Sequence, residues 1–172
     1  MRLFAILFLT LMLQAPLFAR EQFNENNSDP RSGAVQYDFD DMIKTFRSKA
    51  GKVEITLFRK LRFDAKVIEL PSPRKTKYLQ QLLQDFGGAT PPTVSEVMDV
   101  RSANGVKYHL YVVDELVAQV NELLAAGDNV TFYSYHAYNS PYGPGLVVYA
   151  FNRHGKRTLL QQTNQWLSDS DK

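Results

Sequence analysis

The residues of this chain that are best suited to bind a ligand or to react lie toward its C-terminal end, in the stretch NVTFYSYHAYNSPYGPG (129–145). Four tyrosines there surround His136 and a turn rich in Pro and Gly. A tyrosine ring has a flat apolar face and a polar tip, so a tyrosine cluster can stack on sugars or bases or anchor a protein. The stretch predicts a binding surface. The alternative is that these are ordinary strand tyrosines, which cover a neighbouring element.

Motifs for catalysis or metal binding do not occur in the sequence. The chain has no Cys, and His109, His136 and His154 lie in separate segments without an i,i+4 partner. It also lacks the HExxH, GxSxG and P-loop patterns. We therefore predict no catalytic residue, no metal site and no cofactor. An enzyme whose site is assembled from distant residues ranks behind a binding protein.

Alternation along two predicted strands selects the candidate contact residues. If Val130 and Phe132 face the core, Tyr133 and Tyr135 face outward, because neighbouring side chains of a strand point to opposite sides. In VKYHLYVV (106–113) the same reasoning turns every second side chain from residue 107 outward. These outward residues, Lys107, His109, Tyr111, Tyr133 and Tyr135, are predicted to bind the ligand. His136, Tyr138 and Tyr142 of the same tyrosine-rich stretch and its loop are predicted to join them.

Hydrophobic periodicity predicts the elements that position these residues. Their order is a helix over 39–50, a long strand over 52–70, a helix over 73–86, strands over 95–101 and 106–113, a helix over 114–127, and strands over 129–138 and 145–152. Pro73 is expected in the first turn of its helix and Asp114 as the cap of the last one, with Tyr78 and Leu123 in the apolar stripes of the two helices. The long strand is either one bent strand or a hairpin that turns near Arg59. A two-residue turn at Asn104-Gly105 would set Arg101 opposite Tyr108, so a bulge or a longer turn is needed.

Without the helix over 73–86, the order from residue 52 to 152 is β-β-β-α-β-β, which resembles the OB-fold, a five-stranded Greek-key barrel. The resemblance rests on element order and implies a fold, not a function. It also implies that the strands over 95–113 and the loops PSPRKTK (71–77) and NSPYGPG (139–145) flank the ligand. The predicted fold is mainly β with helices, an OB-like small five-stranded barrel with an inserted helix after its first strand. The alternative is an α+β antiparallel sheet with helices on one face.

The N-terminal residues predict export. Arg2 precedes an apolar run from Leu3 to Leu13, and small residues, Ala15 and Ala19, follow, as in a secretory signal peptide. The run is shorter than the roughly 20 apolar residues of a membrane span, so no transmembrane segment is expected after cleavage. The predicted organisation is a signal peptide over 1–19, a flexible leader over 20–37, a single globular OB-like domain over 38–160 and a C-terminal tail over 161–172.

Composition and charge shape the functional hypothesis. Small secreted eukaryotic domains usually carry disulfides, so a chain without Cys fits the bacterial periplasm or exterior better. Between residues 44 and 77, eleven Lys and Arg accompany three acids, and this basic segment is either a partner surface or is neutralised within the fold. We predict an exported, non-catalytic module that contacts an envelope glycan or protein partner through a Tyr-rich face. The alternative is a structural or assembly factor of an envelope or secretion machine, and nucleic acid is not expected as the partner.

Overall fold

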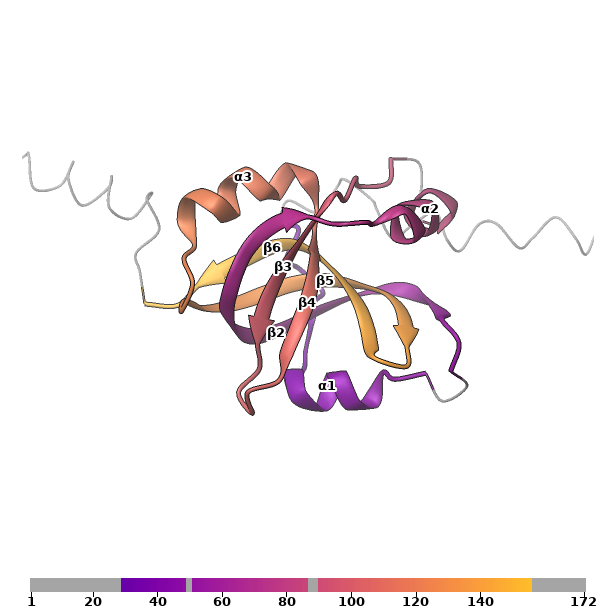
Figure 1. The fold of residues 1–172 in the computed structure, drawn as a ribbon, viewed down its shortest axis with the longest axis horizontal. Helices are drawn as coiled ribbons and strands as arrows, with labels where there is room; N and C mark the ends of the chain where they lie inside the picture. Colours follow the sequence, from indigo (N-terminus) through magenta and orange to yellow (C-terminus); the bar gives the residue numbers. More distant parts are fainter. Residues whose placement is uncertain (1–28, 49–50, 87–89, 156–172) are drawn as a thin grey trace, which may run out of the picture.

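The computed structural model describes residues 29–48, 51–86 and 90–155. Its centre is a barrel of five strands: β2 (Glu54–Pro73), β3 (Glu96–Arg101), β4 (Lys107–Val112), β5 (Asn129–Ser140) and β6 (Gly143–Arg153). A short strand and three helices accompany the barrel (Figure 1): β1 (Val35–Gln36), α1 (Phe39–Thr45), α2 (Lys77–Phe86) and α3 (Asp114–Leu123).

The predicted signal peptide, the leader up to residue 28 and the C-terminal tail lie outside the described residues, and they stay predictions. Residues 29–37, the rest of the predicted flexible leader, contain β1, which pairs in parallel with β2. In the part of the chain that the structure describes, no helix has the length and apolar character that a membrane crossing requires.

The barrel closes because β2 pairs with both β3 and β5. The strand order is β2-β3-β4-β6-β5, and β5 returns to β2. All these pairs are antiparallel except β4–β6, where Tyr111 lies opposite Val147 in a parallel pair. The fold is therefore the predicted OB-like barrel with three helices. The α+β alternative is wrong, because α1 and α3 lie at opposite ends of the barrel and not on one face of an open sheet (Figure 1).

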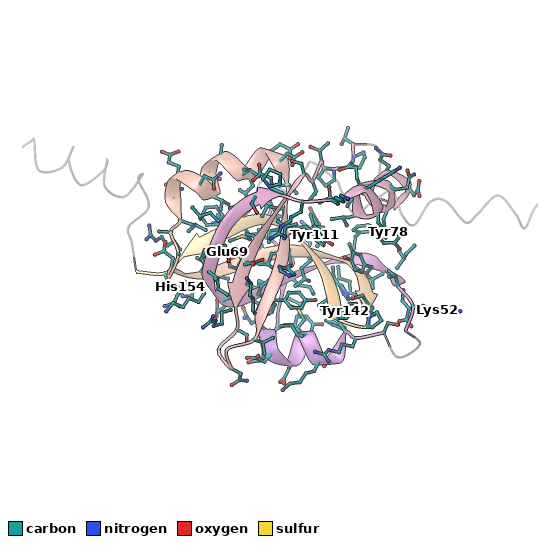
Figure 2. All side chains as sticks on the ribbon, in the orientation of Figure 1. Lys52, Glu69, Tyr78, Tyr111, Tyr142 and His154 are labelled. Carbon is teal, nitrogen blue, oxygen red and sulfur yellow. The ribbon has the colours of Figure 1, made fainter. Side chains whose placement is uncertain are left out.

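The long strand β2 is one bent strand and not a hairpin. A register shift against β5 falls between Ile55 and Arg59, and Phe58 within it has a φ of 42°. Positive φ is strained for a bulky residue, so the bend is a local feature that the pairing on both sides must hold. Beyond the bend, side chains alternate between the interior and the exterior from Leu61 to Val67. A second register shift, against β3, then leaves Glu69 on the exterior (Figure 2).

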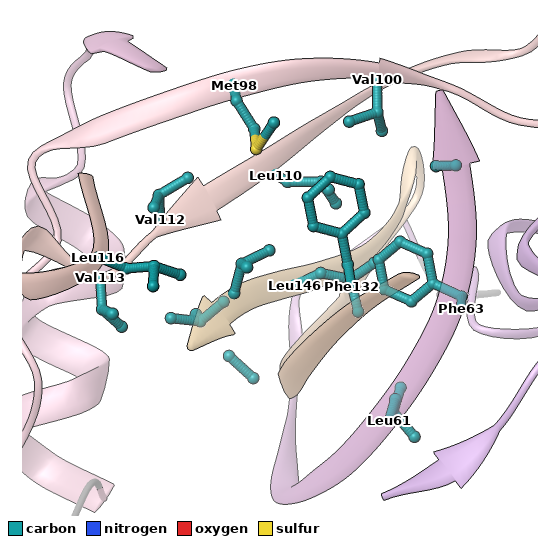
Figure 3. Packing of buried hydrophobic residues seen from close by; sticks show 14 of the residues in the cluster. Leu61, Phe63, Met98, Val100, Leu110, Val112, Val113, Leu116, Phe132 and Leu146 are labelled. Atoms are coloured by element: carbon teal, nitrogen blue, oxygen red, sulfur yellow. The ribbon is translucent and has the colours of Figure 1, made fainter. Parts of the chain in front are cut away.

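The core fills the barrel with side chains from every strand. Phe63 of β2 and Phe132 of β5 are cross-strand partners, fully buried, with ring centroids 6.0 Å apart (Figure 3). Met98 and Val100 of β3 and Leu110 of β4 close the opposite wall and are also fully buried. Apolar side chains fill most of this interior, which leaves the outer surface of the barrel for ligands.

Helices close the two ends of the barrel. At one end α1 inserts Phe39, whose ring stacks on Phe63 at 4.4 Å, and its first turn is capped by Asp38, which accepts from the Asp41 N–H. The helix ends at Thr45, short of the predicted residue 50. At the other end α3 faces the core through a stripe of Leu116, Val120 and Leu124. Leu123, predicted in the same stripe, is only half-buried.

Two helix starts differ from the prediction. Pro73 was expected to open the second helix, but it ends β2 opposite Glu96, and α2 begins at Lys77. Asp114 was expected to cap the third helix, but it is the first residue of α3 and accepts hydrogen bonds from the backbone N–H and the hydroxyl of Ser95. Each residue is used by a tertiary contact that local sequence does not reveal.

The hairpin between β3 and β4 has the longer turn that the register requires. The Ser102 N–H donates to the Val106 carbonyl, so three residues form the loop, and Gly105 within it adopts a φ of 84°. Val100 therefore pairs with Tyr108 on the inner face. The outer face is left to the other set of side chains.

Candidate functional site

The outer face of β3 and β4 carries three of the predicted contact residues. Lys107 and His109 are exposed and Tyr111 is half-buried, which is the predicted outward alternation. Their cross-strand partners on β3 are Arg101, Asp99 and Val97 in the same order. The face is thus charged near the β3–β4 hairpin and increasingly apolar toward α2.

Asp99 holds the charged part of this face together. Its side chain is only 4% exposed, and it contacts the Lys107 ammonium and the His109 imidazole, each at 2.5 Å. Burial opposes its ionisation, but these two contacts outweigh burial and lower the pKa of the Asp99 carboxyl. The Lys107 ammonium also lies 3.4 Å from Glu69. Lys107 is therefore largely neutralised by protein carboxylates.

Three tyrosines from three elements meet at the apolar end of the face. The hydroxyls of Tyr111 (β4) and Tyr138 (β5) lie 2.9 Å apart, and Tyr78 (α2) meets the Tyr138 ring edge-on with centroids 6.0 Å apart. Burial raises the pKa of Tyr138, so its hydroxyl stays protonated. Tyr78 remains 55% exposed (Figure 2). We call Tyr78, Tyr111 and Tyr138 the tyrosine cluster.

The position of α2 explains why Tyr78 belongs to this cluster. Its inner side buries leucines, and its start is tied to the segment before β3: the Thr76 hydroxyl donates to the Val94 carbonyl, and the Gln80 amide oxygen accepts from the Val94 N–H. Tyr78 was predicted to join the buried stripe of this helix, but it points away from that stripe. Sequence periodicity treats an aromatic residue as apolar and carries no signal for this exposure.

A basic loop adjoins the cluster, and the β5–β6 hairpin that carries Tyr138 ends in an exposed tyrosine. Arg74, Lys75 and Lys77 at the start of α2 are exposed, and none forms an ion pair with another described residue. Tyr142 is 85% exposed at the tip of the β5–β6 hairpin. Tyr138 lies along the same hairpin, with its ring over Gly145: a Cβ atom on Gly145 would lie 2.3 Å from that ring. The glycine thus lets the tyrosine lie flat on β6.

The other two strand tyrosines of the predicted surface do not form an exposed platform. Tyr133 is only 7% exposed. Its hydroxyl accepts from the Asn152 side chain, which in turn accepts from Arg31 in the segment before β1. Tyr135 is half-buried, with its ring 4.4 Å from that of Tyr149. Both lie on the outer side of β5 as expected, but neighbouring segments cover that side.

His136, also predicted as a contact residue, lies inside the protein. It is 3% exposed, its Nε2 lies 2.8 Å from the Asn139 side-chain oxygen, and its ring is 4.6 Å from that of Phe46. Burial lowers the pKa of the imidazole. His136 therefore packs the end of the barrel next to α1, and the structure does not bring it to the tyrosine cluster.

Acid should destabilise the protein through His136. In the unfolded chain a histidine binds a proton near pH 6.5, whereas folded His136 does so only at lower pH, so stability falls as pH drops below about 6.5. We expect urea denaturation at pH 7.5 and pH 5 to show a smaller loss for His136→Gln than for the wild type. The pKa of Asp99 is lowered in the folded protein, so protonation of its carboxylate reduces stability only below about pH 4, outside the interval from pH 5 to pH 7.5. Equal losses in both proteins would contradict the expectation.

The face is equipped for binding. The described residues contain no group of three or more His, Asp or Glu side chains that could hold a metal ion. The tyrosine cluster supplies flat rings, and the basic loop supplies cations that form no ion pair within the described part of the chain. These features suit a flat, negatively charged ligand.

The chain has a distant likeness to solved structures. No family model matches the chain, and no curated protein matches it. Among the solved structures that match is the S. pombe Stn1-ten1 complex, with 11% sequence identity and a TM-score of 0.36. The match covers 63% of this chain and 66% of the other, which is slightly under two thirds of its length. A likeness this distant does not supply a ligand.

Two predictions about function are wrong. The chain was predicted to be an exported envelope module, or an envelope assembly factor, that binds through a Tyr-rich face. The structural likeness to the Stn1-ten1 complex gives no support to an envelope role, and Tyr133 and His136 of the predicted face are buried. The prediction that nucleic acid is not the partner is withdrawn as well. The ligand is therefore inferred below from the surface of this chain alone.

Proposed function

We propose that this protein is a binding module for single-stranded nucleic acid, which lies across the outer face of β3 and β4 between α2 and the β5–β6 hairpin. The observation that carries the proposal is the meeting of Tyr78, Tyr111 and Tyr138 beside a basic loop. In an OB barrel this face, with the loop after the first strand and the loop between the last two strands, is a common place for an oligomeric ligand.

The tyrosines account for contacts to the bases. Every base has a flat face, and stacking on an aromatic side chain contributes about 1–3 kcal/mol per base without strong sequence preference. Tyr78 and Tyr142 are the most exposed rings and would meet bases first. Tyr111 and Tyr138 lie deeper and hold the platform in shape through their paired hydroxyls.

The charges account for contacts to the phosphates. Arg74, Lys75 and Lys77 have no ion-pair partner among the described residues, so they can neutralise phosphates without breaking a protein contact. A neutral glycan would leave these three cations unmatched. Lys107 differs, because Asp99 and Glu69 already bind it.

The test is fluorescence anisotropy with a labelled dT oligonucleotide of about 12 nucleotides, within the length that one OB barrel covers. Tyr78→Ala should weaken binding about fivefold or more, since one stacked base contributes about 1–3 kcal/mol. If three phosphates are contacted, the logarithm of affinity should fall with the logarithm of salt concentration with a slope of about −2. Lys75→Gln should reduce that slope.

Two controls separate this proposal from simple charge attraction. An abasic oligonucleotide of the same length keeps the phosphates but lacks the bases. It should bind more weakly, and Tyr78→Ala should not change its affinity. Lys44→Gln removes an exposed cation from α1, which contributes no residue to the tyrosine cluster or the basic loop, and it should leave affinity unchanged. The proposal fails if the dT oligonucleotide does not bind, or if binding is indifferent to Tyr78 and Lys75.

A further inference from the structure

A surface pocket lies at the other end of the β3–β4 face, beside the hairpin that joins these strands. It has a volume of about 510 Å³ and is lined by Lys66 of β2, Arg101 of β3, Asn129 of β5, His154 and the loop of the hairpin, with Asp64 as its acid. Pockets of this size commonly hold small ligands. The tyrosine cluster contributes no residue to the lining.

Two neighbouring cations line this pocket. Lys66 and Arg101 are directly opposite in the antiparallel pair of β2 and β3, and both are exposed. Like charges at directly opposed positions of a sheet repel and destabilise it. Neither residue forms an ion pair with any other described residue. The fold therefore keeps two positive charges close together without an internal anion between them.

The carboxylate that lines the pocket is already engaged. Asp64 accepts a hydrogen bond from the Thr131 hydroxyl and lies 3.6 Å from His154 Nε2. Asp40, near the hairpin loop, accepts from the Ser102 hydroxyl and the Asn104 N–H and does not line the pocket. Lys107 is the next cation across the sheet from Arg101, but it binds Asp99 and Glu69. Lys66 and Arg101 are left to attract an external anion.

We propose that this pocket binds a phosphate group, held between Lys66 and Arg101. The arginine guanidinium can donate two parallel hydrogen bonds to phosphate oxygens, and the lysine adds a point charge. The phosphate belongs either to a nucleic-acid strand that continues from the tyrosine cluster along β4, or to a separate small phosphorylated ligand. This site does not depend on the proposed function, because its binding of inorganic phosphate can be measured without any nucleic acid.

The experiment titrates the protein with inorganic phosphate at constant ionic strength and follows backbone amide signals by NMR. Signals of Lys66, Arg101 and the hairpin loop should shift. Lys66→Gln and Arg101→Gln should each weaken phosphate binding about tenfold, the effect of losing a hydrogen bond to a charged group. Arg62→Gln, an exposed cation of the same strand outside the pocket, is the matched control and should bind phosphate like the wild type.

Stability provides a second readout with an unusual sign. Without phosphate, Lys66→Gln and Arg101→Gln should unfold at the same temperature as the wild type or a higher one, because a repulsion is removed. Added phosphate should stabilise the wild type and Arg62→Gln more than it stabilises Lys66→Gln or Arg101→Gln. Shifts that appear only at the basic loop of α2, or that are equal in all variants, would overturn the proposal.

Oligonucleotide binding then identifies the source of the phosphate. If Arg101→Gln weakens binding of the dT oligonucleotide as well as of phosphate, a backbone phosphate occupies the pocket. If only phosphate binding is lost, the ligand is a separate small molecule. Phosphate binding without any oligonucleotide binding would reject the proposed function but keep this site.

Discussion

Replacement of Phe63 by Ala should lower the free energy of unfolding by about 3–5 kcal/mol, the range for deleting a buried aromatic ring. Phe63 is fully buried and contacts both Phe39 of α1 and Phe132 of β5, so the cavity would open where the helix meets two sides of the barrel. Because small domains have only about 5–15 kcal/mol of stability, the loss is a large share of the total. Urea denaturation followed by circular dichroism measures it.

The control for this variant is Tyr142→Ala, which removes an aromatic ring of similar size from the most exposed position of the β5–β6 hairpin. It should change stability by less than about 0.5 kcal/mol, as surface substitutions usually do. A loss below about 1 kcal/mol for Phe63→Ala would mean that the barrel does not close around this ring.

Replacement of Gly145 by Ala should weaken oligonucleotide binding at least tenfold, although Gly145 itself is not one of the proposed contact residues. The new methyl group would lie 2.3 Å from the Tyr138 ring, so the ring must move. Tyr138 links Tyr111 and Tyr78, so its movement disturbs the whole tyrosine cluster. Stacked bases contribute about 1–3 kcal/mol each, and misplacing two rings gives an effect of this size. Fluorescence anisotropy with the dT oligonucleotide measures it.

A double-mutant cycle distinguishes displacement of the ring from general damage. In the Tyr138→Ala background there is no ring to displace, so adding Gly145→Ala should change neither affinity nor melting temperature. In the wild-type background the same change should weaken binding and lower stability by about 1–3 kcal/mol through overpacking. Additive effects of the two substitutions would show that Gly145 acts independently of Tyr138.

The barrel was predictable because its signals are local and repeated along the chain. The alternation of side chains predicted that Lys107 and His109 point outward, and the order of the elements predicted how the strands are connected. Alternation does not reveal which outer surface another segment covers. Tyr133 is buried through a chain of contacts from Arg31 and Asn152, residues far from it in sequence. No period of two or of 3.6 residues carries that information.

The parts of the site that were missed depend on register and on tertiary contacts. Lys66 and Arg101 are adjacent only because β2 and β3 pair in one particular register. Tyr78 joins the cluster because Thr76 and Gln80 anchor α2 to Val94. The sequence indicated a basic loop and a tyrosine-rich hairpin separately, and the fold brings them together.

The pairing of β2 with β5 also determines when this protein can fold during synthesis. Phe63 and Phe132 are direct partners although they are 132 − 63 = 69 residues apart in the chain. Non-local strand pairs of this kind form slowly, because a long loop must close first. As the ribosome makes the chain, β2 therefore emerges long before its partner and keeps one edge open until β5 follows. An open strand edge with alternating apolar residues can pair with the same edge of another chain. Incompletely synthesised copies of this protein are therefore prone to aggregate with one another.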